Sequence, residues 1–149
     1  MSKMIFINLP VVDLAKSIVF YQAIGAFRDD RFADESAQCM TFSDSIHVML
    51  LTHEKFASFT TRAIADAQQD AQVLFALSQE DRDAVEAVYN KAIAAGGTQH
   101  GEAEDHGFMI SRAFTDPDGH GWQVMWMDMA AFSAVPDGAS AGTQAEIDA

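Results

Sequence analysis

The stretch TDPDGHGWQVMWMD, residues 115–128, predicts a tight turn followed by a strand with one amide side chain among its apolar residues. Asp-Pro-Asp-Gly is typical of turns, because proline presets φ and glycine accepts a positive φ. The apolar run that follows indicates a buried strand, and Gln123 lies within it. A carboxylate there could move a proton, whereas an amide has no useful basicity near neutral pH. The strand therefore raises the question of whether it belongs to an enzyme or to a binding protein.

The start of the chain predicts a strand followed by a helix. MIFINLPV, residues 4–11, carries apolar side chains on both faces, which is typical of a buried strand. Asp13 is the expected N-cap of a helix over residues 14–24, and Gly25 stands where the helix should stop. Two further strands are predicted at residues 37–44 and 45–52.

The same pattern returns in residues 71–97, which predict a strand, a capped helix and a double-glycine stop. An offset of 68 residues places Phe6 on Leu74 and Asp13 on Asp81, so we interpret the halves as a tandem repeat. We expect one domain over residues 1–132, divided into module one (1–53), a linker helix (54–69) and module two (70–132), and then a flexible tail (133–149).

Two such halves, with LPVVDLAKSIVFYQAIGA (residues 9–26) and FTDPDGHGWQVMW (residues 114–126), resemble the glyoxalase/bleomycin-resistance/extradiol-dioxygenase family, the vicinal oxygen chelate superfamily. The resemblance covers about residues 1–130. It implies an α+β fold of two tandem βαβββ modules whose sheets curve into a cup that holds the ligand. It also implies a homodimer.

In metal-dependent members of that family, four His, Glu or Gln side chains hold one divalent ion. The resemblance places these positions at Phe6, Leu50, Leu74 and Gln123. Phenylalanine and leucine have no donor atom, so the usual site cannot be assembled. We therefore predict no metal, no other cofactor and no catalytic residue.

Strand alternation extends this assignment to the wall of the cup, because residues two apart share a face. The predicted ligand-binding residues are Phe6, Asn8, Val48, Leu50, Leu74, Ala76, His106, Gln123 and Met125. Most of these are apolar, as in small-molecule pockets, although they could also simply fill the cup as core. Trp122, Val124 and Trp126 should face the other way, to pack on helices or to form a dimer seam.

The histidines divide by position. His47 alternates out of phase with Leu50, so it should face away from the cup. The loop over residues 100–106 holds two histidines and three acids, which either bind metal or form a solvated acidic loop. The resemblance places this loop near the rim of the cup, which favours His106. Arg112 could pair with a substrate anion or with a core carboxylate.

Composition narrows the class of protein. A net charge of −13 argues against nucleic acid, which requires clustered Lys and Arg, and favours a cationic ligand. No apolar run reaches the roughly 20 residues of a membrane span. The start lacks the layout of a signal peptide, and the single cysteine, Cys39, fits a reducing compartment as a small core residue. We expect a cytoplasmic protein.

The favoured hypothesis is a metal-independent protein that binds a small apolar or cationic molecule, like the drug-sequestering members of the superfamily. The alternative is a metal-dependent lyase, isomerase or dioxygenase with ligands recruited from Glu102, His106 or His120. A third possibility is a scaffold protein whose cup is filled by its own side chains. The ligand stays open, as does whether one chain or two form the cup.

Overall fold

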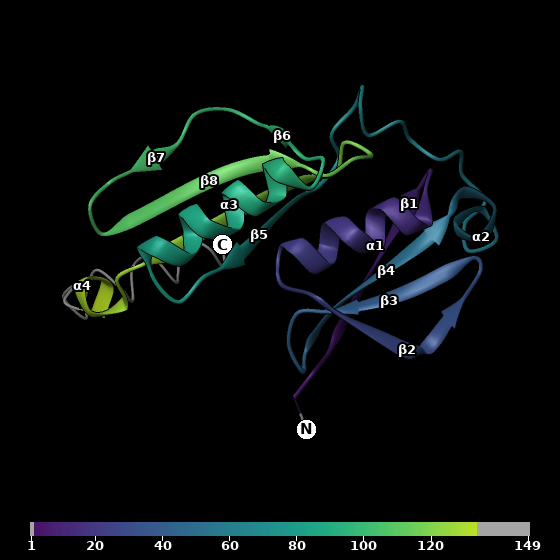
Figure 1. Ribbon diagram of the computed structural model, residues 1–149, viewed down its shortest axis with the longest axis horizontal. Helices are drawn as coiled ribbons and strands as arrows, with labels where there is room; N and C mark the ends of the chain where they lie inside the picture. Colours follow the sequence, from purple (N-terminus) through teal and green to yellow (C-terminus); the bar gives the residue numbers. More distant parts are fainter. Residues whose placement is uncertain (1, 134–149) are drawn as a thin grey trace, which may run out of the picture.

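The computed structural model describes residues 2–133, in which two β-sheets each carry one long helix (Figure 1). The first module consists of β1 (Ile5–Val11), α1 (Leu14–Ala23), β2 (Phe27–Asp34), β3 (Ala37–Thr41) and β4 (Ile46–Thr52). A short helix, α2 (His53–Ala57), follows it. The second module consists of β5 (Leu74–Ser78), α3 (Arg82–Ala94), β6 (Thr98–Gln99), β7 (Glu104–Asp105), β8 (Met109–Thr115) and β9 (Gly121–Met127). The last described helix is α4 (Met129–Ser133).

The two sheets have the same topology. The first has the strand order β1-β4-β3-β2 and the second β5-β9-β8-β6, with β7 also paired to β8. In each sheet the first and last strands of the module are parallel neighbours, and the remaining pairs are antiparallel. The predicted α+β fold of two tandem βαβββ modules is confirmed, with β6 and β7 sharing one strand position of the second module.

The helix boundaries follow the predicted signals. The Asp13 side chain accepts a hydrogen bond from the backbone N–H of Lys16 at 3.1 Å, and Asp81 caps α3 in the same way. Gly25 has a φ of 109°, the left-handed conformation that ends a helix without steric cost in glycine. Cap and stop therefore come from local sequence in both modules.

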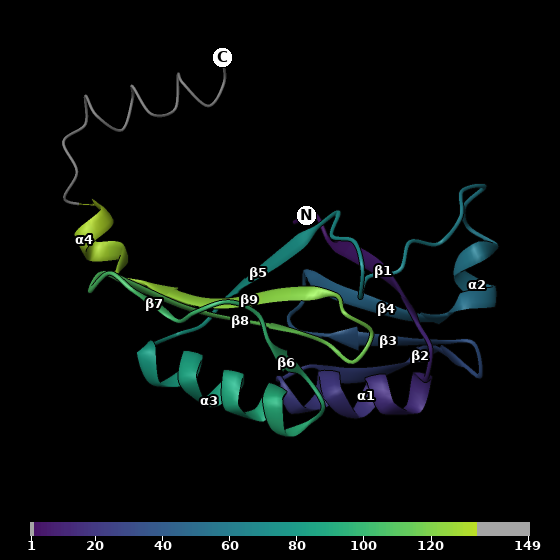
Figure 2. The same ribbon diagram turned by 90° about the horizontal axis from the view of Figure 1, so that it is seen from above.

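Both long helices lie on the same side of the sheets (Figure 2). Leu9, Val48 and Leu50 belong to the same core as Phe20 of α1, and Trp122 and Val124 of β9 belong to it too. The rings of Phe20 and Phe114, one from each module, are 5.9 Å apart. The modules therefore share one hydrophobic core, and the opposite face of each sheet, which we call its open face, points away from α1 and α3.

The turn over residues 116–120 joins the modules, and we call it the inter-module clasp. Its Asp116 carboxylate accepts a hydrogen bond from the Tyr21 hydroxyl at 2.6 Å, and Asp118 accepts the backbone N–H of Val12 at 2.8 Å. His120 Nε2 lies 2.8 Å from the carbonyl oxygen of Pro10. The Asp-Pro-Asp-Gly turn thus has a structural role that its sequence alone did not reveal.

The segment between the modules differs from the prediction. Helix occurs only at His53–Ala57, and residues 58–73 contain neither helix nor strand, so a linker helix over 54–69 is present only at its start. The backbone of Ala67 packs so closely on the clasp that a Cβ at Gly119 would lie 2.8 Å from its carbonyl oxygen. Tertiary packing on the clasp overrides the local helical pattern.

Two further predictions concern the C-terminal tail and membrane-spanning helices. Apart from Ser133, the predicted tail over 133–149 lies outside the described residues. Within residues 2–133, no helix combines the length and the apolar composition needed to cross a membrane.

Candidate functional site

The open face of the second sheet carries four of the predicted ligand-binding residues. Leu74 and Ala76 of β5 lie on it with Gln123 and Met125 of β9, because Ala76 pairs with Gln123 in the parallel register. Leu74 is 67% exposed. Within the described chain the Gln123 side-chain amide makes no hydrogen bond, so its donors and acceptor stay available.

The residues between these positions point to the helices, as predicted. Trp122 and Val124 are buried, and Trp126 packs against the same core. The Trp122 indole N–H donates to the Tyr21 hydroxyl at 3.0 Å, which ties the strand to α1. These residues were expected either to pack on helices or to form a dimer seam, and in the structure they pack against the core beneath the helices.

The first sheet corrects the predicted orientation of β4. The register pairs Phe6 with His47 and Asn8 with Met49, so these four side chains share the open face. Val48 and Leu50 pair with Ile7 and Leu9 and lie fully buried in the core, so the prediction that they line the cup is wrong. The run Val-Met-Leu-Leu is apolar at every position, so alternation could not show which pair faces the helix.

The same correction applies to His47, which the sequence predicted to face away from the cup. Its ring stacks on Phe6 with centroids 4.5 Å apart, on the open face. Only 7% of His47 is exposed. The residue is therefore part of the open face but is largely covered.

The register also moves one of the four positions at which the superfamily resemblance expects metal ligands. Gln123 lies two residues beyond Gly121, the partner of Leu74. The equivalent residue in the first sheet lies two beyond His47, the partner of Phe6, and is Met49 rather than Leu50. The four positions are then a phenyl ring, a thioether, an isobutyl group and one amide. Hard divalent ions require nitrogen or oxygen donors, so this set does not fit them.

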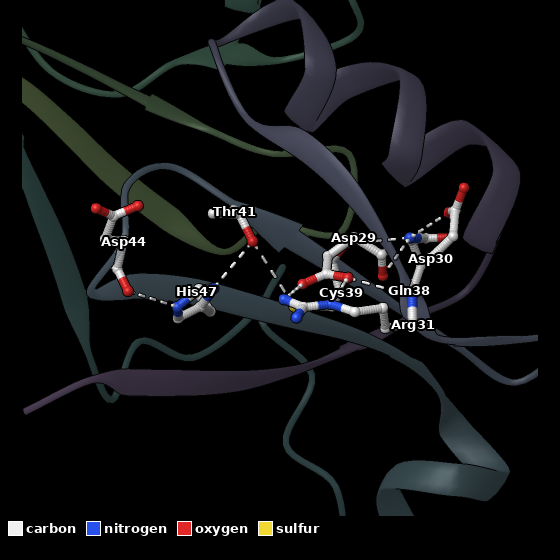
Figure 3. A network of polar contacts seen from close by, with 8 residues as sticks. All are labelled: Asp29, Asp30, Arg31, Gln38, Cys39, Thr41, Asp44 and His47. Atoms are coloured by element: carbon white, nitrogen blue, oxygen red, sulfur yellow. Dashed lines mark hydrogen bonds and ion pairs between the residues drawn. The ribbon is translucent and has the colours of Figure 1, made fainter.

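A polar network lies on the open face of the first sheet (Figure 3). His47 Nε2 is 3.2 Å from the carbonyl oxygen of Asp44, which only accepts, so this nitrogen carries the proton. His47 Nδ1 then accepts from the Thr41 hydroxyl at 2.9 Å. The Cys39 sulfur lies 4.0 Å from the same hydroxyl oxygen. The network fixes the tautomer of His47 and uses both of its nitrogens.

Charge and burial set the acidity of two groups at this network. The Arg31 guanidinium, 2.7 Å from Asp29, lowers the pKa of that carboxyl to about 2. Burial raises the pKa of the Cys39 thiol, and none of the residue is exposed. A protonated, covered thiol is a poor nucleophile, which agrees with the predicted core role of Cys39.

A cavity of about 500 Å³ lies where the two modules meet. Asn8 of β1, Leu74 and Phe75 of β5 and much of the segment between the modules line it. Its size falls within the roughly 300–1,000 Å³ typical of small-molecule pockets. Among the predicted ligand-binding residues, only Asn8 and Leu74 line this cavity, which we call the junction cavity.

A second cavity, of about 630 Å³, lies on the other side of residues 64–68. Three carboxylates line it, but each already accepts a backbone N–H: Asp13 from Lys16, Asp66 from Gln68, and Asp118 from Val12. Caps and turns account for these side chains. The junction cavity, with more apolar side chains and an unbonded amide at Asn8, is the better candidate for a ligand site.

The residues of the metal-dependent alternative do not converge. His106 is exposed and lies 3.6 Å from Glu104, whereas His120 belongs to the clasp. Within residues 2–133 no three His, Cys, Asp or Glu side chains are grouped to hold a metal ion. Arg112 pairs with Glu86 at 2.6 Å and lies over the Tyr89 ring, so it contacts α3.

Sequence reasoning missed Met49, His47 and the lining contributed by residues 60–73. For Met49, no sequence signal was present, because the assignment depends on the strand registers that pair Phe6 with His47 and Leu74 with Gly121. For residues 60–73, no local pattern marks a cavity wall, because the wall forms only when the segment packs across the clasp.

Comparisons with known proteins agree on the fold. A hypothetical protein, SA1046 from S. aureus, matches with a TM-score of 0.71 and 23% identity, over 85% of this chain and 94% of that one. A glyoxalase-related enzyme from Fulvimarina pelagi matches with a TM-score of 0.71 and 18% identity, over 85% and 88%. A bleomycin resistance determinant encoded on transposon Tn5 matches with a TM-score of 0.58 and 18% identity, over 85% and 99%.

A search of curated proteins finds no match. The family model described as Glyoxalase/Bleomycin resistance protein/Dioxygenase superfamily matches residues 3–124, a span that includes both modules and Gln123. With this match and the paired βαβββ modules, the chain belongs to the glyoxalase/bleomycin resistance protein/dioxygenase superfamily.

Proposed function

We propose that this protein binds a small apolar or cationic molecule without a metal ion. The observation that carries the proposal is the chemistry of Phe6, Met49, Leu74 and Gln123, which occupy the positions where the superfamily resemblance, corrected by the strand register, expects metal ligands. One amide and three side chains without nitrogen or oxygen cannot compete with the hydration shell of a hard divalent ion. The same side chains offer apolar contact and one hydrogen-bonding group to an organic molecule.

Exposure and volume support this use. Phe6 is 43% exposed and Leu74 67% exposed, although each is a large apolar side chain on a sheet face. Burying such surface against a ligand is favourable by about 25 cal/mol per Å². The junction cavity, at about 500 Å³ and partly open to solvent, adds a concave volume beside Leu74. The net charge of −13 would attract a cation at long range.

We also propose that the protein is a homodimer, as the superfamily resemblance implies. Large apolar side chains remain exposed at the open faces and on the edge strand β2, among them Phe6, Phe27 and Leu74. A second copy packed over them would remove this surface from water and would close the open faces. Light scattering should give twice the 16.2 kDa mass of one chain, and a monomer mass at micromolar concentration would contradict the proposal.

Thermal unfolding with small probes tests the binding function. Phenylpropanol and phenylpropylamine, which share an apolar body, should raise the melting temperature, because a ligand that binds only the folded state stabilises it by about 2.7 kcal/mol at one hundred times its Kd. Leu74→Trp should place an indole ring across the β5 side of the junction cavity and abolish the shift.

Val19→Trp is the matched control, since Val19 is an exposed apolar residue on α1 and does not line the junction cavity. This variant should keep the full shift. A full shift in Leu74→Trp would place the ligand elsewhere, and the absence of any shift in the wild type would contradict the binding function itself.

A further inference from the structure

Arg62 is exceptional among the arginines of this protein. The chain has 22 acidic residues against nine Lys and Arg, so a guanidinium without an acidic partner is unusual. All five arginines lie in the described chain, and four are ion-paired: Arg28 with Asp30, Arg31 with Asp29, Arg82 with Asp105 and Arg112 with Glu86. Within residues 2–133, Arg62 forms no ion pair.

The same residue lines the junction cavity. Its position is set by the segment between the modules, where the backbone N–H of Arg62 donates to the Thr60 hydroxyl at 3.2 Å. Asp70 also lines the cavity, but the two side chains do not pair with each other. Arg62, an exposed residue, therefore brings to the lining a permanent positive charge whose five N–H donors are not used by the described part of the chain.

The lining also offers apolar surface and amide groups, and among the described lining residues Asp70 carries the one carboxylate. Phe56, Leu74 and Phe75 supply apolar surface, and the Asn8 amide makes no hydrogen bond and can donate to a second oxygen. A guanidinium binds a carboxylate through two parallel N–H···O bonds, a geometry that a neutral or cationic group cannot reproduce. An apolar body and one anionic end match this arrangement.

We infer that the junction cavity takes a small organic carboxylate, held at its charged end by Arg62 and along its apolar body by Phe56, Leu74 and Phe75. This inference rests on the proposed metal-independent binding function, and it assigns the ligand an anionic end in place of the cationic one. The net charge of −13 attracts cations to the protein at long range. At contact distance, however, the hydrogen bonds and charge of Arg62 select the end group of the ligand.

Three probes with the same body separate the end groups: phenylpropionate, phenylpropanol and phenylpropylamine. Calorimetric titration of the full-length wild type should show phenylpropionate binding about tenfold tighter than phenylpropanol, a difference of about 1.4 kcal/mol. Arg62→Gln should remove this advantage and leave phenylpropanol binding unchanged. Arg62→Lys should retain part of it, because lysine keeps the charge but not the two-pronged geometry.

Lys91→Gln, on α3, makes the same charge change outside the junction cavity and should leave all three affinities unchanged. Salt should weaken phenylpropionate alone, since exposed ion pairs are screened. Tightest binding by phenylpropylamine, or an advantage of the acid that survives Arg62→Gln, overturns the carboxylate inference while the binding function stands. Failure of all three probes to bind the wild type would contradict both.

Discussion

The open faces of the two sheets share a topology but differ in chemistry. On the first sheet, both ring nitrogens of His47 lie within hydrogen-bonding distance of a partner, and the Phe6 ring stacks on its imidazole. Cys39 of the same sheet is fully buried. On the second sheet, Leu74 is exposed and the Gln123 amide is unbonded. A duplicated fold therefore does not duplicate the site, because topology sets which positions face outward and the residue types decide what those positions can do.

The largest expected effect tests which residues of the two sheets belong to the core. Leu50→Ala should lower the free energy of unfolding by about 2–5 kcal/mol, because it leaves a cavity in a fully buried position. Leu74→Ala, its counterpart on the open face, should cost under about 0.5 kcal/mol. Denaturant unfolding measures both, and equal costs would show that the orientation of β4 described above is wrong.

The clasp that joins the two modules gives the next effect. Asp116→Asn should lower the free energy of unfolding by about 1–3 kcal/mol, since Asp116 accepts hydrogen bonds from the Tyr21 hydroxyl and from two backbone N–H groups of the turn. Unfolding should remain a single transition in the wild type by fluorescence and by circular dichroism. Two separated transitions would show that the modules do not share a cooperative core.

The pH dependence of stability should have opposite signs at the clasp and at the first sheet. Burial raises the pKa of Asp116, so its contribution is full below the unfolded value of 3.8 and is lost as pH rises through the folded value. The hydrogen bond from Arg31 lowers the pKa of Asp29 to about 2, so its contribution is present above pH 3.8 and is lost as pH falls toward about 2. The stability that the wild type has over Asp116→Asn should fall as pH rises, and the stability that it has over Asp29→Asn should fall as pH drops toward about 2. Differences that change with pH in the same direction would contradict this prediction.

A smaller effect tests the network that covers the first open face. Thr41→Val removes the hydroxyl that donates to His47 Nδ1 and should cost about 1 kcal/mol, the usual net contribution of one hydrogen bond. Thr98→Val on the second sheet is the control, because the Thr98 side chain is exposed and makes no hydrogen bond. If chemical denaturation showed the same loss of unfolding free energy for Thr41→Val and Thr98→Val, the network would not stabilise the protein.

The smallest expected effect concerns metal. Zinc, nickel or manganese at one equivalent should leave the melting temperature unchanged, and Gln123→Glu should not create a site, because a single carboxylate leaves Phe6, Met49 and Leu74 without donors. Stoichiometric metal in protein purified without chelator would contradict metal independence and would favour the lyase, isomerase or dioxygenase alternative.

The elements themselves could be predicted from sequence because their signals are local. Asp13 and Asp81 cap their helices through their own side chains, and Gly25 ends one by its own backbone conformation. Alternation across Trp122, Gln123 and Val124 gave the correct face of β9 because polar and apolar residues differ there. The same method failed on β4, where Val48, Met49 and Leu50 are all apolar.

By itself, the sequence determined the repeated βαβββ order and the superfamily, since both depend on residue types at short range or at a constant offset. The tertiary structure alone decided that Met49 rather than Leu50 faces outward, that the Asp116 turn fastens one module to the other, and that Arg62 is unpaired in a cavity. Those features depend on strand register and on contacts between residues tens of positions apart. Local propensity carries no information about such contacts, because they form only when the modules pack together.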